Sequence, residues 1–226
     1  MKIFLGIDPG LDGCLVAIDD QGQVIEWHDT PTITVEKIST LRGGRQKIRR
    51  RREYDMHAMH RILAGFRGRA DYIVAALEKS QPMPGFGRHG KPGGGAAGES
   101  TEPQAGHGSI ASFLLGVGWA TWRSLLVANG IPLATEPAAV SWKAKLLADR
   151  GKDKGAARAV AMAMFPAFAA HLVRVKDHGR AEASLLAEFG RRATGGDTAR
   201  PVTDEFIARQ VELAKAAPPP PKDFEA

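Results

Sequence analysis

The stretch KIFLGIDPGLDG, residues 2–13, decides how the chain is interpreted. Its first seven residues form a short, largely apolar run of residues that favour β-strands, as expected of a buried strand. Pro9 and Gly10 then force the backbone to turn. Asp8 therefore stands at the end of a strand, where a carboxylate is held rigidly. The motif alone leaves two roles open for Asp8, a cap for the amides of the turn or a functional acid, whereas Asp12 fits a turn residue.

Further runs extend this pattern into an α/β fold. Residues 13–18 and 23–28 are β-rich and are joined by an Asp-Asp-Gln-Gly turn, which predicts an antiparallel three-stranded meander with the first strand. Apolar spacing then predicts a helix at 54–66, a strand at 72–77, a helix at 109–127, a strand at 131–134, and helices at 138–147, 156–164 and 180–189. This order predicts a mixed five-stranded sheet flanked by helices, the pattern of an RNase H-like fold.

Length and composition favour one folded domain in a reducing compartment. The 226 residues are 43% hydrophobic and 25% charged, enough for one substantial core. A net charge of +6 suits a polyanionic partner, although an ordinary basic protein has the same balance. Cys14, the single cysteine, lies in an apolar run and excludes a disulfide framework and a Cys-rich zinc site. We see no signal peptide, transit peptide or membrane-spanning run, so a cytoplasmic protein is expected.

Three segments interrupt the predicted elements. A basic loop spans 42–52, a stretch rich in Gly and Pro spans 82–108, and four consecutive prolines lie in the C-terminal extension 196–226, whose end has the composition of a disordered tail. Loops this long inside a compact domain are commonly either functional or disordered. We therefore expect one RNase H-like domain over 1–195, with the basic loop and the insertion, followed by the extension.

Three more acids stand where carboxylates can converge. Glu78 directly follows a strand-like apolar run, and Asp177 and Glu182 belong to KDHGRAEA, residues 176–183, which opens an apolar helix. Each acid has a simpler alternative: solvation for Glu78, helix capping for Asp177, and a favourable first-turn position for Glu182. If they converge with Asp8, their like charges need a cation between them. Carboxylates suit Mg²⁺ or Mn²⁺, and two such ions about 4 Å apart cleave phosphodiesters.

The order of these motifs resembles that of RuvC-like Holliday junction resolvases, in particular their phage-type and monokaryotic chloroplast-type branch. The resemblance spans about residues 1–190 and is carried, in order, by Gly6-Ile7-Asp8-Pro9-Gly10, Glu78-Lys79-Ser80-Gln81-Pro82-Met83-Pro84, Ser141-Trp142-Lys143, Phe165-Pro166 and Lys176-Asp177-His178-Gly179-Arg180-Ala181-Glu182-Ala183. No single piece is specific, but the ordered set is strong. The insertion 85–108 departs from the shorter housekeeping members, whose relatives use a compact turn there to probe the junction.

The resemblance implies a Mg²⁺-dependent homodimer, with Mn²⁺ as a substitute, that nicks two strands symmetrically across a four-way DNA junction. It implies four metal ligands, Asp8, Glu78, Asp177 and Glu182. His178 falls close to a position where some members use an acid or a His, which makes it a candidate for proton transfer; a plain imidazole at a helix N-terminus is the alternative. A Lys near the scissile phosphate is also implied. The candidates are Lys154, which aligns best, and Lys152 and Lys143, with a solvated surface Lys as the alternative for each.

Positive charge and glycine mark two expected DNA contacts. Seven basic residues fall within the basic loop: Arg42, Arg45, Lys47, Arg49, Arg50, Arg51 and Arg52. A solvated basic arm is the alternative to phosphate contacts there. In the Gly/Pro-rich insertion the candidates for stacking or phosphate contact are Phe86, Arg88 and Lys91, unless this stretch is a plain spacer. The resembled family places the helix at 109–127 in its dimer interface, whereas the apolar sequence alone first indicates a core helix.

Together these features favour a Mg²⁺-dependent crossover junction endodeoxyribonuclease. Two alternatives are a broader branched-DNA nuclease or transposase-like enzyme with the same site, and a junction-binding protein in which the acids are structural. Sugar kinases and actin-like ATPases also begin with Gly-Ile-Asp-x-Gly after a strand, but they need a second phosphate loop and an adenosine motif that we do not find. We therefore expect neither a nucleotide cofactor nor a membrane partner.

Overall fold

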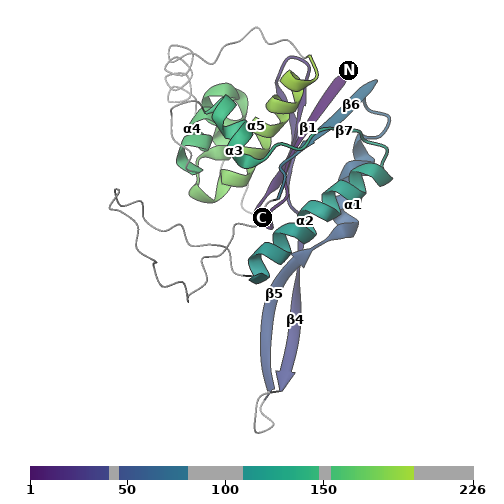
Figure 1. Cartoon of the computed structure of the whole chain (residues 1–226), viewed down its shortest axis with the longest axis vertical. Helices are drawn as coiled ribbons and strands as arrows, with labels where there is room; N and C mark the ends of the chain where they lie inside the picture. The colour runs from purple at the N-terminus through teal and green to yellow at the C-terminus, as the bar shows by residue number, and fades with distance from the viewer. Residues whose placement is uncertain (41–45, 81–108, 148–153, 196–226) are drawn as a thin grey trace, which may run out of the picture.

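A mixed sheet of five strands forms the centre of the molecule (Figure 1). The computed structural model describes residues 1–40, 46–80, 109–147 and 154–195. The strand order is β3-β2-β1-β6-β7, where the strands are β1 (Lys2–Asp8), β2 (Cys14–Asp19), β3 (Val24–Asp29), β6 (Tyr72–Leu77) and β7 (Leu133–Thr135). β2 runs antiparallel to β1 and β3, while β1, β6 and β7 are parallel. The predicted α/β class and RNase H-like order, a three-stranded meander extended by two parallel strands, are confirmed.

Helices cover both faces of this sheet. They are α1 (Met56–Phe66), α2 (Ser109–Ala128), α3 (Ala139–Leu146), α4 (Lys154–Met164) and α5 (His178–Ala193), with 3-10 turns at Pro166–Leu172 and Val175–Asp177. α1 and α2 pack on one face, and α3, α4 and α5 pack on the other, as Figure 1 shows. Each predicted helix is present, although α4 and α5 each begin two residues earlier than the pattern indicates.

Side chains alternate between the two faces of the sheet along each strand, and this alternation places Asp8 and Glu78 on the same face. On β1, Phe4 belongs to the core beneath α3, α4 and α5, and Leu5 belongs to the core beneath α1 and α2. Successive side chains of a strand point to opposite faces, so Asp8 shares the α5 face with Phe4. By the same rule Glu78, four residues after the buried Val74 of β6, is directed to the α5 face.

α5 approaches β1 so closely that only glycine fits at Gly6. A Cβ atom there would lie 2.0 Å from the Ala183 carbonyl oxygen and 2.2 Å from the Ala187 backbone nitrogen, both in α5. The N-terminal end of α5 is held equally close, because a Cβ atom at Gly179 would lie 2.2 Å from the Asp12 carbonyl oxygen. These backbone approaches fix how α5 lies over the carboxyl end of β1.

A β-hairpin replaces the predicted basic loop. β4 (Thr32–Thr40) and β5 (Gln46–Tyr54) pair antiparallel along their whole length, and Figure 1 shows this ribbon extending well beyond the sheet. The loop prediction for 42–52 is therefore wrong from residue 46 onward. Four consecutive arginines hide the strand character of β5, which comes from its pairing with the β-branched residues of β4 and not from its own preference.

Several predictions concern residues outside the described ranges. These are the tip of the basic loop at 42–45, the insertion 82–108 and the extension 196–226, so the domain boundary at 195 stays a prediction. Among the helices that the structure does describe, none combines the length and apolar character needed to cross a membrane.

Candidate active site

The carboxyl ends of β1 and β6 bring Asp8 and Glu78 together. The two strands are parallel neighbours with Ile7 opposite Leu77, and the Glu78 amide donates to the Ile7 carbonyl oxygen at 3.0 Å. Parallel strands end at the same edge of a sheet, so the two acids emerge side by side. Asp8 is also held by its turn, because its Oδ1 accepts a hydrogen bond from the Gly10 amide at 3.1 Å. Asp8 therefore caps the turn and also lies beside Glu78, so the two roles that the sequence left open are compatible.

Glu182 reaches the same place from the second turn of α5. Glu182 is only 7% exposed, and its negative charge raises the pKa of both Asp8 and Glu78. The tight approaches at Gly6 and Gly179 set the position of this helix over β1 and the turn that follows it. Asp8, Glu78 and Glu182 together form what we call the acid cluster.

Burial and mutual repulsion dominate the electrostatics of the acid cluster. Burial, followed by the charges of Glu78 and Glu182, raises the pKa of Asp8 to about 7, although a backbone amide and Lys143 act to lower it. Burial and Glu182 also raise the pKa of Glu78, against the hydrogen bond from Trp142 and the charge of Lys143. Strongly shifted carboxyl groups held close together are frequent at catalytic and metal-binding sites.

Two adjacent residues of α3 supply hydrogen-bond donors to the acid cluster. Trp142 Nε1 donates to Glu78 Oε2 at 2.7 Å, and Lys143 Nζ donates to Glu182 Oε1 at 2.8 Å. Trp142 is fully buried, and the Lys143 side chain keeps 16% exposure, so its ammonium can still meet a ligand from solvent. Sequence reasoning missed Trp142 as a site residue; its place beside Lys143 in Ser-Trp-Lys is the signal that could have found it.

The three lysine candidates have different outcomes. Lys143, which the sequence analysis gave with Lys152 as an alternative to Lys154, contacts the acid cluster. Lys154, the favoured candidate, begins α4, and its side chain is outside the described part of the structure, as is the whole of Lys152.

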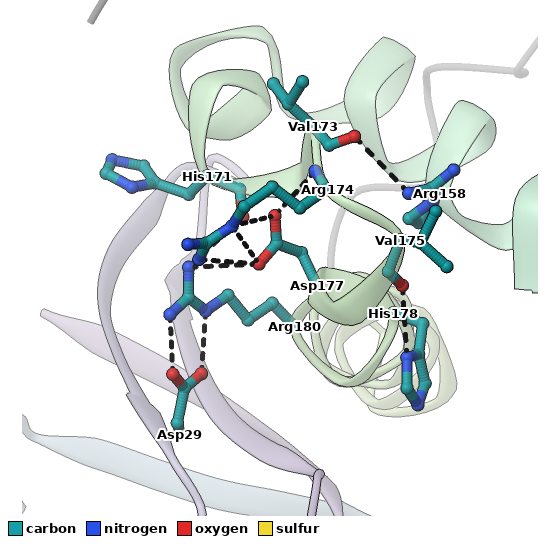
Figure 2. Close-up of polar contacts among 9 residues, drawn as sticks. All are labelled: Asp29, Arg158, His171, Val173, Arg174, Val175, Asp177, His178 and Arg180. Carbon is teal, nitrogen blue, oxygen red and sulfur yellow. Dashed lines mark hydrogen bonds and ion pairs between the residues drawn. The ribbon is translucent and has the colours of Figure 1, made fainter.

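Asp177 departs from the expected set of four metal ligands. Its carboxylate accepts hydrogen bonds from the Arg174 amide at 2.8 Å and from the Arg174 guanidinium at 3.0 Å, and Arg180 lies 3.6 Å away (Figure 2). Burial acts to raise the pKa of Asp177, but the Arg174 hydrogen bonds and the charges of both arginines outweigh it and lower the pKa. Arg180 in turn makes a bidentate ion pair with Asp29 at 2.6 and 2.7 Å. Asp177 thus belongs to an arginine network and not to the acid cluster.

A cavity of about 390 Å³ borders this arginine network. It is lined by residues of the β1–β2 turn, the end of β3, the hairpin and the start of α5, namely Leu11, Asp12, Gly13, Asp29, Thr30, Arg52, Arg174, Lys176, Asp177, His178 and Arg180. His178 faces this cavity with its Nδ1 3.4 Å from the Val175 carbonyl oxygen, and Figure 2 shows its ring directed away from Asp177. The cavity neighbours the acid cluster but includes none of its three acids.

The acid cluster has the chemistry of a divalent-metal site without, in this conformation, the arrangement of one. Hard carboxylate oxygens suit Mg²⁺ or Mn²⁺, and a cation between these acids would relieve the repulsion that raises the pKa of Asp8. Within the described ranges, however, no three His, Cys, Asp or Glu side chains are grouped so as to hold a metal ion. Trp142 donates to one oxygen of Glu78, and Lys143 donates to one oxygen of Glu182, so each of these carboxylates has a second oxygen to offer a metal.

Comparison with known proteins finds likeness at the level of solved structures and not of sequence. No protein-family model and no curated protein matches the sequence. The solved structure of T. thermophilus RuvC in complex with a Holliday junction substrate is similar over 86% of this chain and 97% of that chain, with 10% sequence identity and a TM-score of 0.41. A likeness at this level carries no argument about function, which has to rest on the residues of the site.

The expected DNA-contact residues are placed as follows. Lys47, Arg49, Arg50, Arg51 and Arg52 lie on β5, and Lys143 lies at the acid cluster. The remaining candidates lie outside the described residues: Arg42, Arg45, Phe86, Arg88, Lys91 and Lys152.

Proposed function

We propose that this protein is a divalent-metal-dependent nuclease that acts at the acid cluster. The observation that carries the proposal is the convergence of Asp8, Glu78 and Glu182 from β1, β6 and α5 in a largely buried place. Buried like charges destabilise a fold unless a cation compensates them, so an arrangement of this kind is expected where a function requires it. The net charge of +6 supports an anionic polymer as the substrate.

The residues have distinct roles in this proposal. Asp8, Glu78 and Glu182 would hold Mg²⁺, for which Mn²⁺ could substitute, and the chemistry supplied would be activation of water and stabilisation of charge on the phosphodiester. Trp142 orients Glu78 through its indole N–H, and Lys143 is placed to hold a phosphate oxygen beside the carboxylates. Second-sphere donors of this kind usually decide whether a carboxylate points at the metal.

We assign Asp177 to a different task, anchoring the start of α5. Its contacts with Arg174 and Arg180, and the pairing of Arg180 with Asp29 on β3, join the start of this helix to the sheet. Glu182 follows one and a half turns later on the same helix, so this anchor keeps it over β1. His178 is one of the cavity-lining residues that a DNA strand passing there would meet.

The substrate within this proposal is a four-way DNA junction, cut by paired symmetric nicks. Support comes from the ordered motifs, which resemble those of RuvC-like resolvases. Paired nicks need two active sites, and α2 offers a surface for a second copy of the chain. Phe113 and Val127 are 70% and 76% exposed on a side of α2 that they share with Gly116 and Ala120. A homodimer through α2 would place two acid clusters in one complex.

Nicking of a synthetic four-way junction tests the proposal. In Mg²⁺ or Mn²⁺ the wild-type protein is expected to give paired nicks, and Asp8→Asn is expected to bind the junction without cutting it. Flaps and linear duplex of the same length separate a junction resolvase from a broader branched-DNA nuclease or a strand-transfer enzyme. An inert wild type in both metals, or full activity in Asp8→Asn, would show that the acid cluster is not a nuclease centre.

The pairing of Lys143 with Glu182 favours one second candidate, a junction-binding protein without catalysis. In that case the ammonium serves permanently as the cation of the acid cluster. Titration with Mg²⁺ separates the two candidates, because a permanent Lys–Glu pair predicts no metal-dependent rise in thermal stability, whereas a metal site predicts a rise that saturates with concentration.

A further inference from the structure

The β4–β5 hairpin has two faces of different character, and its register separates them. Thr34, Glu36 and Ile38 pair with Arg52, Arg50 and Ile48, whereas Val35, Lys37 and Ser39 pair with Arg51, Arg49 and Lys47. Directly opposed residues share a face of a two-stranded ribbon, and neighbouring residues alternate between faces. The basic run of β5 is therefore divided, with every second side chain on each face.

On the first face the positive charges are already paired within the protein. Arg50 donates to Glu36 Oε1 at 2.7 Å, and Arg52 contacts Asp12 Oδ1 and the Leu11 carbonyl oxygen, each at 2.6 Å. We call this side the paired face. Arg52 joins the ribbon to the turn that follows Asp8, and the hydroxyl of Tyr54 adds a hydrogen bond to the Pro9 carbonyl oxygen at 3.0 Å.

The second face, which we call the open face, carries charge that the described part of the protein does not neutralise. Lys37, Lys47 and Arg49 have no carboxylate within ion-pair distance among the described residues, and only Arg51 has one, on Glu53. Lys37 and Arg49 stand directly opposite each other, an arrangement that destabilises an isolated hairpin. Residues 41–45 add two arginines and no acid to the sequence of this hairpin.

Beyond its base, the ribbon also lacks support from the rest of the fold. Figure 1 shows it projecting from the body, and within the described residues its close packing is between its own two strands. A two-stranded ribbon of this kind is only marginally stable in water. Opposed cations on an unsupported ribbon are a cost that an anionic ligand would remove.

We propose that the open face of the hairpin is a DNA-docking ribbon that lies in the major groove of a duplex arm, with Lys37, Lys47 and Arg49 on its phosphates. The inference takes its substrate class, DNA, from the proposed function. It assigns a contact to Lys37, which lies on the opposite strand from the basic run, and it excludes Arg50, which lies inside that run.

Dimensions and anchoring favour duplex DNA as the occupant. The B-DNA major groove, about 12 Å wide, admits a two-stranded β-ribbon, whereas the major groove of A-form RNA is too narrow. Each strand of the ribbon has nine residues, a length of about 30 Å at 3.3 Å per residue. Because Arg52 and Tyr54 hold the base of the ribbon against the turn after Asp8, a duplex on the ribbon keeps a fixed direction relative to the acid cluster.

Matched single substitutions on neighbouring residues test this inference. Arg49→Gln and Arg50→Gln each remove one positive charge from adjacent positions of β5, and Lys37→Gln removes one from β4. Binding to a 30-base-pair duplex and to a four-way junction is measured in EDTA over a series of salt concentrations. Each lost phosphate contact is expected to reduce the slope of log K against log salt by about 0.9.

The open-face variants Lys37→Gln and Arg49→Gln are each expected to reduce this slope and to weaken binding by roughly tenfold near 0.1 M salt. The double variant is expected to lose about twice as much binding free energy as either single variant. Arg50→Gln is expected to leave the salt slope unchanged and the binding affinity within twofold of the wild type. Arg49→Lys, which keeps the charge, is expected to bind like the wild type. Equal losses in Arg49→Gln and Arg50→Gln would overturn the two-faced ribbon. Equal losses on duplex RNA of the same length would overturn the major-groove docking.

These measurements do not depend on catalysis. The binding series is made without metal, so an open-face effect in a protein that cuts nothing would retain the ribbon and reject the nuclease. Conversely, junction cleavage at saturating enzyme that is unchanged by Lys37→Gln, together with unchanged salt slopes, would retain the nuclease and reject the ribbon. Thermal unfolding of each variant confirms that these exposed positions do not alter the fold.

Discussion

Replacing Asp8 with Asn should make the metal-free protein more stable while abolishing the proposed nuclease activity. Asn keeps an oxygen that can accept the Gly10 amide, which lies 3.1 Å from Asp8 Oδ1, so the turn retains its cap. The substitution removes the charge that burial, Glu78 and Glu182 oppose. A structural role for Asp8 predicts the contrary result, a loss of stability.

The magnitude and its pH dependence follow from the raised pKa of Asp8. The folded protein holds this proton up to about pH 7, whereas the unfolded chain releases it near 3.8. Below pH 3.8 the carboxyl is neutral in both states and costs nothing. Between these values the unfolded chain binds fewer protons than the folded one, so stability falls as pH rises, and above pH 7 the cost is constant. The interval corresponds to at most about 4 kcal/mol, and partial exposure of Asp8 reduces this to about 2 kcal/mol.

Thermal unfolding of wild type and Asp8→Asn in EDTA, from pH 4 to pH 8, measures the effect. At pH 8 the variant is expected to melt about 4–8 °C higher, a shift of the size that about 2 kcal/mol gives in a domain of this length. The difference should vanish near pH 4, and Mg²⁺ should stabilise the wild type alone. A variant that melts below the wild type at pH 8, or a difference that does not change with pH, would refute this account of the acid cluster.

Three further substitutions, and one control substitution, have expected outcomes of different kinds. In a urea titration, Gly6→Ala should lower the free energy of unfolding by about 3 kcal/mol or more, because its Cβ would meet the backbone of α5 at 2.0 Å. Gly65→Ala is the control: a Cβ there would have nothing within 4 Å, so this substitution should stabilise α1 by about 0.5–1 kcal/mol. Trp142→Phe loses the 2.7 Å hydrogen bond to Glu78 and should slow junction nicking by about tenfold with a stability loss of about 1–2 kcal/mol. Lys143→Met leaves Glu182 without its 2.8 Å partner, so stability without metal should fall by about 2–3 kcal/mol, and added Mg²⁺ should recover part of it. No recovery with Mg²⁺ would count against a metal ligand role for Glu182.

The positions of Asp8 and Glu78 could be predicted because short-range rules determine them. Each acid follows an apolar strand, and the period of two sets the face on which it emerges. The two strands had only to be parallel neighbours for the acids to meet, and the three-stranded opening followed by a helix favours that arrangement. Glu182 could be predicted less directly, since its place depends on the close approach of α5 to Gly6.

The hairpin could not be predicted from local signals, since the two strands give unequal ones. β4 alternates threonine and other β-branched residues in a strand-like way, but β5 presents a run of arginines that resembles a solvated arm. Only the pairing of the two strands shows that Arg49 and Arg50 lie on opposite faces. Among the described residues, Arg50 has a carboxylate partner and Arg49 has none. Charge counted along the sequence is therefore a poor guide to which of these residues are free of a carboxylate partner within the described part of the chain.

Asp177 and Asp8 show how the environment separates acids that the sequence treats alike. Asp8 ends β1 and Asp177 ends the 3-10 turn before α5, and both fit a cap or a metal ligand. Burial and two neighbouring carboxylates raise the pKa of Asp8, while Arg174 and Arg180 overcome burial and lower that of Asp177. A cation offered to Asp8 relieves repulsion, but a cation offered to Asp177 has to displace two guanidinium groups that already neutralise it. Metal binding at the acid cluster therefore gains nothing by recruiting Asp177, and the three-acid set is the one that the electrostatics favour.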